Sequence, residues 1–349
     1  MIIDITGFGW SGSGAVLDLL SEYDNVIKLD NTMEFSILHI VDGIMDLEYK
    51  LSYKHCRFLD SDIAIKRFLH LVSHYYNKNK RLKGKIKPIC ENYISQLEGI
   101  EYNSRSFYDL IYLNDKRTSY IGLYNAILSK LFNNQLLRSI GGKQIYNILK
   151  LYNISKKYLS YTPNNFLHET RALMSQILEL FRNGQKGVLL TDHMFSPDNP
   201  NVFFKYIEED TKCIIVRRDP RDTYILAKEI YKGKIPVPVD NVDDFIWFYK
   251  KTIEETKVPD SDKILSVQFE DLIYRYEETV NKIEIFTGIR HHVRRKTLFN
   301  PSVSVNNTQL FSKYKKYDTD IRKIEEKLPL SLFHFENYSH IETVSNVIF

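Results

Sequence analysis

Apolar and polar positions alternate with two different periods along the chain, and their succession predicts a mixed α/β protein. Apolar runs of strand length occur at residues 1–6, 26–29, 187–191, 212–216 and 263–269. Stretches with apolar residues at every third or fourth position follow several of these runs and predict helices, at residues 13–23, 200–208, 222–231 and 276–287. Short apolar strands that alternate with helices favour a parallel sheet connected by crossover helices.

The middle of the chain has a different pattern. Between residues 36 and 183 it is mostly helical, and the clearest amphipathic helices fall at 60–76 and 165–181. No internal repeat or low-complexity linker separates this part from the strands on either side. We therefore expect a single domain over residues 1–349, in which 36–183 is a large helical insertion.

Glycines and serines follow the first predicted strand. Residues 7–14 read Gly-Phe-Gly-Trp-Ser-Gly-Ser-Gly and lead directly into the predicted helix at 13–23. Glycines let the backbone approach an anion, and a helix N-terminus directs N–H groups and its dipole toward it. Ser11 and Ser13 add hydroxyl donors. The segment therefore predicts a cradle for a phosphate-like group.

Three arginines follow the strand at 212–216. The stretch 214–222 reads Ile-Ile-Val-Arg-Arg-Asp-Pro-Arg-Asp and supplies Arg217, Arg218 and Arg221. In open α/β sheets ligands bind at the carboxyl ends of the strands, and planar guanidinium groups suit phosphate oxygens. The two interspersed aspartates indicate that particular arginines are oriented. A second anion-binding element is therefore expected at the same edge of the sheet.

The glycine-rich loop alone leaves a second interpretation open. Residues 7–12 fit the G-x-G-x-x-G pattern, and Asp30 lies where an acid that binds a ribose hydroxyl would follow the next strand. This interpretation is an NAD(P)-dependent oxidoreductase, but it leaves the arginines unexplained. An ATP or GTP hydrolase is disfavoured because no Gly-Lys-Ser/Thr follows the loop.

Three motifs in the same order resemble the PAPS-dependent sulfotransferases, with the carbohydrate or heparan-type members most similar. Residues 10–14, Trp-Ser-Gly-Ser-Gly, resemble the family's 5′-phosphosulfate loop. Residues 216–222, Val-Arg-Arg-Asp-Pro-Arg-Asp, resemble its 3′-phosphate motif. Residues 269–272, Phe-Glu-Asp-Leu, resemble a later Tyr-Glu-Asp-Leu segment, and residues 40–180 carry no resemblance.

The resemblance implies a P-loop-kinase-like three-layer fold with a central parallel sheet, in which the insertion at 36–183 forms part of an acceptor cleft. It implies transfer of a sulfuryl group from the co-substrate PAPS (3′-phosphoadenosine 5′-phosphosulfate) to a hydroxyl, without a metal. Arg218 would bind the 3′-phosphate. The loop residues that would bind the other end of the donor are Gly9, Trp10, Ser11, Gly12, Ser13 and Gly14.

Two positions depart from the family pattern. Trp10 stands where the family has lysine or arginine, so the loop cation is expected from Arg217 or Arg221. The family also has a serine eight residues beyond the phosphate-binding arginine, where this chain has Leu226. Ser302 and Asn306, in a late polar stretch, are the candidates for that contact. The missing loop cation also keeps open a non-catalytic nucleotide- or glycan-binding protein on the same fold.

The resemblance also gives two candidates for the catalytic base. Glu34 follows the second predicted strand in a Met-Glu-Phe context that resembles the heparan-type members. His193 follows the strand at 187–191, where cytosolic members carry a catalytic histidine, and Asp192 would orient the histidine or the substrate. We place Glu34 ahead of His193. The heparan-like context and the aromatic-rich middle favour a carbohydrate acceptor, such as a surface polysaccharide precursor.

The composition narrows the classes of partner and of cellular location that remain open. The 48 basic and 44 acidic residues give a net charge of +4, which does not indicate a nucleic-acid partner. The three cysteines have no metal-binding spacing, and no secretory signal or bilayer-length apolar run is present. We therefore expect a cytoplasmic protein without an integral membrane segment, either soluble or peripheral to the inner face of a membrane.

Overall fold

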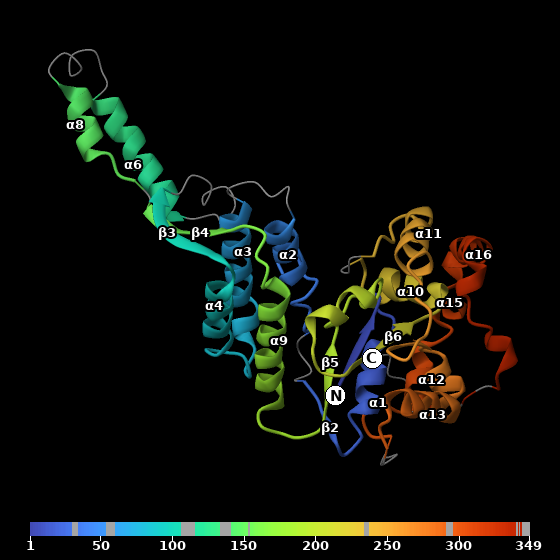
Figure 1. Ribbon diagram of the computed structural model, residues 1–349. Helices are drawn as coiled ribbons and strands as arrows, with labels where there is room; N and C mark the ends of the chain where they lie inside the picture. Colours follow the sequence, from blue (N-terminus) through green and yellow to red (C-terminus); the bar gives the residue numbers. More distant parts are fainter. Residues whose placement is uncertain are drawn as a thin grey trace. The chain divides into compact units, whose positions relative to one another are not determined.

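The computed structural model describes residues 1–29, 34–53, 60–105, 116–132, 141–152, 154–233, 237–290 and 296–339, together with residues 341 and 343 (Figure 1). The chain divides into two compact units. One comprises Met1–His39 with Leu178–Phe349, and the other comprises Ile40–Ile177. The interpretation of the whole chain as a single domain stays a prediction.

The first unit contains a five-stranded sheet. Its strands are β1 (Ile2–Gly7), β2 (Val26–Ile27), β5 (Val188–Asp192), β6 (Thr211–Arg217) and β7 (Ile264–Gln268). Their spatial order is β2-β5-β1-β6-β7, and every neighbouring pair is parallel. All residues of β1 are buried, as expected for a central parallel strand. The predicted α/β fold with a central parallel sheet is confirmed.

Helices pack on this sheet and beside it. On one face, α1 (Ser13–Leu20) and α13 (Tyr276–Thr287) pack against the apolar side chains of β1, β6 and β7 (Figure 1). A second apolar cluster joins α10 (Pro220–Ile225), α11 (Val242–Tyr249) and α16 (Asp318–Lys327). Three short helices connect these parts, α12 (Asp271–Tyr274), α14 (Pro301–Ser304) and α15 (Leu310–Lys313). Two predicted helices are therefore present at α1 and α13.

The strand order locates the ligand edge of this unit. In the sheet, the first strand, β1, lies between β5 and β6, which are the third and fourth strands of this sheet along the chain. The connection after β1 leads to β2 on one side of it, and the connection after β6 leads to β7 on the other side. Ligands of open α/β sheets bind at such a switch point, beyond the carboxyl ends of the strands. Both the loop after Gly7 and the arginine pair at the end of β6 begin there, because Gly7 is in register with Val216.

The same order disfavours the dinucleotide interpretation. In the dinucleotide-binding fold, the first and second strands of the chain are neighbours, and the acid after the second strand reaches the ribose. Here β5 separates β1 from β2, because it pairs with both. Asp30, the proposed ribose-binding acid, lies outside the described residues.

Helices dominate the second unit. They are α2 (Ile44–Ser52), α3 (Asp60–His74), α4 (Ile86–Gln96), α6 (Lys116–Phe132), α8 (Gly142–Leu149) and most of α9 (Phe166–Arg182). The amphipathic helices predicted at 60–76 and 165–181 are therefore confirmed as α3 and α9. An antiparallel pair, β3 (Gly99–Arg105) with β4 (Ile154–Ser160), was not predicted. Its strands carry polar residues on both faces, so no alternation marks them.

Two further helix predictions need correction. Residues 200–208 form two short 3₁₀ turns, Pro200–Val202 and Phe204–Tyr206, instead of one α-helix. The break lets Phe203 and Tyr206 both reach the core, where they are buried. The helix predicted at 222–231 begins earlier, at Pro220, and continues beyond Ile225 as a π-helical turn at Leu226–Ile230. Proline suits the first position of a helix.

Gly12 allows a stability prediction. It has a φ of +91°, and a Cβ atom there would lie 2.4 Å from a ring carbon of Phe269. We expect Gly12→Ala to lower the free energy of unfolding by about 2 kcal/mol, because it adds left-handed strain and a clash. Gly14, inside α1, has open space around its Cβ position, so Gly14→Ala should stabilise by about 0.5 kcal/mol. Urea denaturation of both variants is the measurement, and equal effects would contradict the geometry.

Candidate functional site

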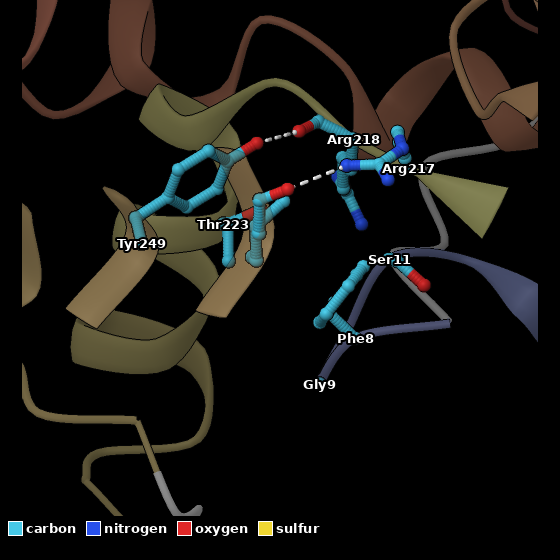
Figure 2. Close-up of a pocket in the computed structure, with 8 residues that line it drawn as sticks. Phe8, Gly9, Ser11, Arg217, Arg218, Thr223 and Tyr249 are labelled. Carbon is cyan, nitrogen blue, oxygen red and sulfur yellow. Dashed lines mark hydrogen bonds between the residues drawn. The ribbon is translucent and has the colours of Figure 1, made fainter. Parts of the chain in front are cut away.

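A pocket lies where the glycine-rich loop meets the carboxyl end of β6. Figure 2 shows side chains from the loop, from β6 and its extension, and from the helices that follow it. The residues that line the pocket are Phe8, Gly9, Ser11, Arg217, Arg218, Thr223, Tyr249 and Ile253. The two predicted anion-binding elements are thus brought together at one place.

The loop presents a buried hydroxyl to this pocket. Ser11 is 4% exposed, and its Oγ atom is buried without a hydrogen-bond partner within the described part of the chain. A Cβ atom on Gly7 would lie 2.1 Å from that oxygen, so glycine at this position makes room for the serine. The helix that follows, α1, starts without a side-chain cap on its N-terminal N–H groups. The loop therefore keeps several donors for an anion.

Arg217 supplies a cation to the same pocket. Its Nη1 donates to the carbonyl of Ile253 at 2.8 Å, and its guanidinium lies 5.5 Å from the ring centroid of Phe8 (Figure 2). Its Nε and Nη2 atoms are buried and find no hydrogen-bond partner among the described residues. Burial lowers the pKa of Arg217, yet arginine stays charged in proteins. Buried donors of a charged group that lack partners indicate a site built for an anion.

Arg218 contacts the glycine-rich loop, Phe269 and the late polar segment at Asn307. The side chain is 2% exposed, and its Nη1 donates to the Trp10 carbonyl at 3.3 Å, while Nη2 donates to the Asn307 carbonyl. Its guanidinium lies 4.7 Å from the centroid of the Phe269 ring, against which Gly12 also packs. Three other segments of the chain, the glycine-rich loop, Phe269 and Asn307, therefore converge on this one arginine.

Arg221 is held inside the protein and does not line the pocket. Two of its nitrogens bind the Asp219 carboxylate, with Nη2 to Oδ2 at 2.7 Å, and Nη1 donates to Glu325 at 2.9 Å. Burial lowers the pKa of Arg221, but the hydrogen bonds to Asp219 and Glu325 and the charges of these carboxylates together outweigh burial and raise the pKa above its usual range. Among the two candidates for the missing loop cation, these contacts favour Arg217.

Two other buried carboxylates accept hydrogen bonds from backbone N–H groups of the segments around the arginine motif. Asp222 accepts from the backbone N–H groups of Gln309 and Leu310 at 2.8 and 2.7 Å, and burial raises its pKa to about 7. Glu270 accepts from the N–H of Asp219 at 3.0 Å, and burial raises its pKa to about 8. The aspartates and the Phe-Glu-Asp-Leu segment thus hold the arginine motif in place.

The Trp10 side chain packs against apolar groups and is not among the residues that line the pocket. Its ring stacks on Tyr231, with centroids 3.4 Å apart, and packs against the second apolar cluster. Its backbone has a φ of +66°, which carries the side chain away from the course of β1 while its carbonyl accepts from Arg218. Trp10 therefore anchors the loop.

The late polar stretch reaches the arginine motif through a residue that sequence reasoning missed. Asn307 is buried, accepts from Arg218 through its carbonyl, and has an Oδ1 atom without a partner among the described residues. The N–H of Ser302 is bound by the Asn300 side chain, and the Asn306 carbonyl accepts from Lys313 at 3.2 Å. Tyr249, whose hydroxyl donates to the Arg218 carbonyl at 2.8 Å, was also missed.

Glu34, Asp192 and His193 lie together at the carboxyl end of β5. The N–H of Phe35 donates to the Asp192 carbonyl at 2.7 Å, and this places the exposed Glu34 beside that strand end. The His193 ring contacts Asp192 Oδ1 through Nδ1 at 2.7 Å and the Gly7 carbonyl through Nε2 at 3.0 Å. The two candidates for the base are thus adjacent to the start of the glycine-rich loop.

These contacts determine the charge of His193. The Gly7 carbonyl only accepts hydrogen bonds, and so does an ionised Asp192, so both ring nitrogens donate and the ring is an imidazolium. Burial alone lowers the pKa of His193, but the hydrogen bond to Asp192 and the charge of that carboxylate raise it to about 9. An imidazolium whose nitrogens both donate cannot accept a proton. The arrangement therefore favours Glu34 as the base.

A pH dependence follows from His193. Its pKa is higher in the folded protein than the ordinary value of 6.5, so its stabilising effect is complete below pH 6.5 and is lost as pH rises toward 9. The melting temperature of the parent protein should therefore fall more over this interval than that of His193→Asn. Asparagine tolerates the local φ of +55°. Parallel melting curves for the two proteins would refute this assignment.

Known proteins provide few points of comparison. No protein-family model and no curated protein matches this chain. Among solved structures, the chain is similar to the sulfotransferase domain of the Synechococcus PCC 7002 olefin synthase, at 13% identity over 86% of this chain and 76% of that one, with a TM-score of 0.36. It is also similar to the sulfotransferase domain of the curacin biosynthetic pathway, at 9% identity over 95% and 98%, with a TM-score of 0.40.

Both neighbours carry the name of the family that the three motifs resemble. The described residues contain no group of three or more histidines, cysteines or acids that could hold a metal ion.

Proposed function

We propose that this protein is a sulfotransferase, which binds PAPS and transfers its sulfuryl group to a hydroxyl of an acceptor. One observation carries the proposal. At the switch point of the sheet, Ser11 Oγ and the Nε and Nη2 atoms of Arg217 are buried donors of one pocket, without hydrogen-bond partners within the described ranges. Buried donors of this kind are rare in native proteins unless a ligand satisfies them.

The donor set fits a nucleotide that is anionic at both ends. PAPS supplies the activated sulfuryl group and carries a phosphate at the 3′ position. Ser11, Arg217 and the uncapped start of α1 would hold one anionic group. Arg218 lines the same pocket and would hold the other, with its orientation fixed by the carbonyls of Trp10 and Asn307. Arg217 thereby supplies the positive charge that a lysine or arginine of the loop supplies in the family, at the position where this chain has Trp10.

The catalytic task of the protein is mainly positioning. Sulfuryl transfer resembles phosphoryl transfer, in which alignment and positive charge do most of the work. Glu34 accepts the proton of the acceptor hydroxyl, because it is exposed and lies at the strand end beside the loop. His193 is a positioning residue that holds the Gly7 carbonyl, and hence the start of the loop, while Asp192 holds His193.

For the acceptor we propose a carbohydrate, such as a surface polysaccharide precursor. The support is the sequence around Glu34, which resembles that of the heparan-type members. The assignment of residues in the helical insertion to an acceptor cleft stays a prediction.

Thermal unfolding with ligands tests the proposal. PAP, the desulfated donor product, should stabilise the folded protein by about 2.7 kcal/mol at a hundredfold excess over its Kd, whereas NADH should have no effect. Stabilisation by NADH alone would instead support the oxidoreductase. Transfer of labelled sulfate to a panel of glycans then separates an enzyme from a non-catalytic binding protein, which would bind PAP without turnover.

A further inference from the structure

The helices α6 and α8 of the second unit expose many large apolar side chains. Tyr120, Leu123 and Ile127 on α6 are 70%, 61% and 53% exposed, and Ile148 on α8 is 80% exposed. Tyr124, Leu131, Ile145 and Leu149 are exposed as well. Apolar patches of this extent are unusual on a monomer and mark an interaction surface.

The connections of the two helices explain why these side chains remain uncovered. Both helices lie between β3 and β4, whose last paired residues are Arg105 and Ile154, so they extend from one end of a two-stranded ribbon. They lie side by side (Figure 1). Polar contacts join them, since the side chain of Asn125 donates to the Leu151 carbonyl at 2.8 Å and accepts from its N–H at 3.0 Å. These contacts hold the two helices together, while the apolar side chains named above stay exposed.

Charge indicates what covers this surface. From residue 116 to residue 168 the sequence contains no aspartate or glutamate. The basic residues of the two helices and the position that follows them are Lys116, Arg117, Lys130, Lys143 and Lys150. Exposed leucine, isoleucine and tyrosine interspersed with lysine are typical of helices that lie in a bilayer interface, and anionic headgroups attract such a surface.

We propose that the α6–α8 pair docks on an anionic lipid bilayer. The apolar side chains enter the boundary between headgroups and acyl chains, and the lysines contact the headgroups. No helix in the described part of the chain is long and apolar enough to cross a membrane, so the pair lies along the surface. A second copy of the same surface is disfavoured as the occupant, because it would bring basic residues together without any acid to pair them. This inference does not depend on the proposed function.

Vesicle co-sedimentation of the full chain tests the docking. The protein should bind vesicles of phosphatidylglycerol and phosphatidylcholine at least tenfold more strongly than vesicles of phosphatidylcholine alone, and salt should weaken the binding. The triple variant Leu123→Ser, Ile127→Ser, Ile148→Ser should lose at least tenfold in binding. The double variant Ile285→Ser, Leu330→Ser, which changes exposed apolar residues of the other unit, should bind like the parent. Absence of binding to anionic vesicles, or equal binding by the triple variant, overturns the proposal.

Fluorescence gives a second readout that does not depend on the triple variant. The emission of Ile127→Trp should shift to shorter wavelength when anionic vesicles are added, relative to the parent background of Trp10 and Trp247. Ile285→Trp should show no shift. Sedimentation equilibrium without lipid should show a monomer. A dimer that the triple variant dissociates would assign the surface to a second copy and reject the membrane.

Discussion

Arg217→Ala is expected to weaken the binding of PAP by about 100-fold or more. The parent side chain supplies a buried charge with two donors, and each charge-assisted hydrogen bond contributes about 1.5–3 kcal/mol. Its removal also leaves an anionic group of the ligand buried without its cationic partner. Titration calorimetry with PAP measures the loss directly.

Two companion variants sharpen this test. Arg217→Lys keeps a positive charge without the planar fork, so its loss should lie between those of the parent and the alanine variant. Arg275→Ala removes a half-exposed arginine that pairs with Asp271, and PAP binding should be unchanged. If Arg217→Ala bound PAP as tightly as Arg275→Ala does, the buried donors would have another purpose and the proposed donor site would be wrong.

Glu34→Gln is expected to lower the rate of sulfate transfer by about 10²–10⁴-fold, the usual contribution of a general base, while PAP binding stays unchanged. The amide keeps the size of the side chain but cannot accept the proton of the acceptor hydroxyl. The measurement is transfer of labelled sulfate from PAPS to the acceptor found in the glycan panel, together with a PAP titration.

Glu208→Gln is the matched control, because Glu208 is an exposed glutamate on the same unit. It should transfer sulfate at the parent rate. His193→Asn should lower the rate less than Glu34→Gln does, since an imidazolium that holds the Gly7 carbonyl acts through the loop. Normal turnover by Glu34→Gln together with an inactive His193→Asn would assign the base to His193 instead.

The sheet and the meeting of the two anion-binding elements were predictable because both depend on local patterns. Short apolar runs mark buried parallel strands, and the carboxyl ends of adjacent strands must lie at one edge. Gly7 and Val216 are indeed in register there. The glycine loop and the arginine motif each carry their chemistry within a few residues of a strand end, so their positions follow once the strands are known.

The direction of each side chain could not be predicted in the same way. Sequence alone leaves Arg217 and Arg221 as equal candidates for the loop cation, but the structure turns Arg221 toward Asp219 and Glu325 and leaves Arg217 in the pocket. Which guanidinium faces which group depends on packing between segments that are distant in sequence.

The particular residues that later segments contribute could not be predicted for a related reason. Tyr249 and Asn307 reach the arginine motif from helical and 3₁₀ segments that carry no motif and no fixed spacing to it. Similarly, nothing near His193 in the sequence indicates that the Gly7 carbonyl engages its Nε2. The strands β3 and β4 were missed because their polar residues give no period-two signal.

The decisive experiment is a crystal structure of the protein with PAP. We predict that one phosphate of PAP lies within hydrogen-bond distance, about 3 Å, of both Ser11 Oγ and the Arg217 guanidinium. A fully occupied PAP molecule that leaves Ser11 and Arg217 without contact would contradict the proposed donor site.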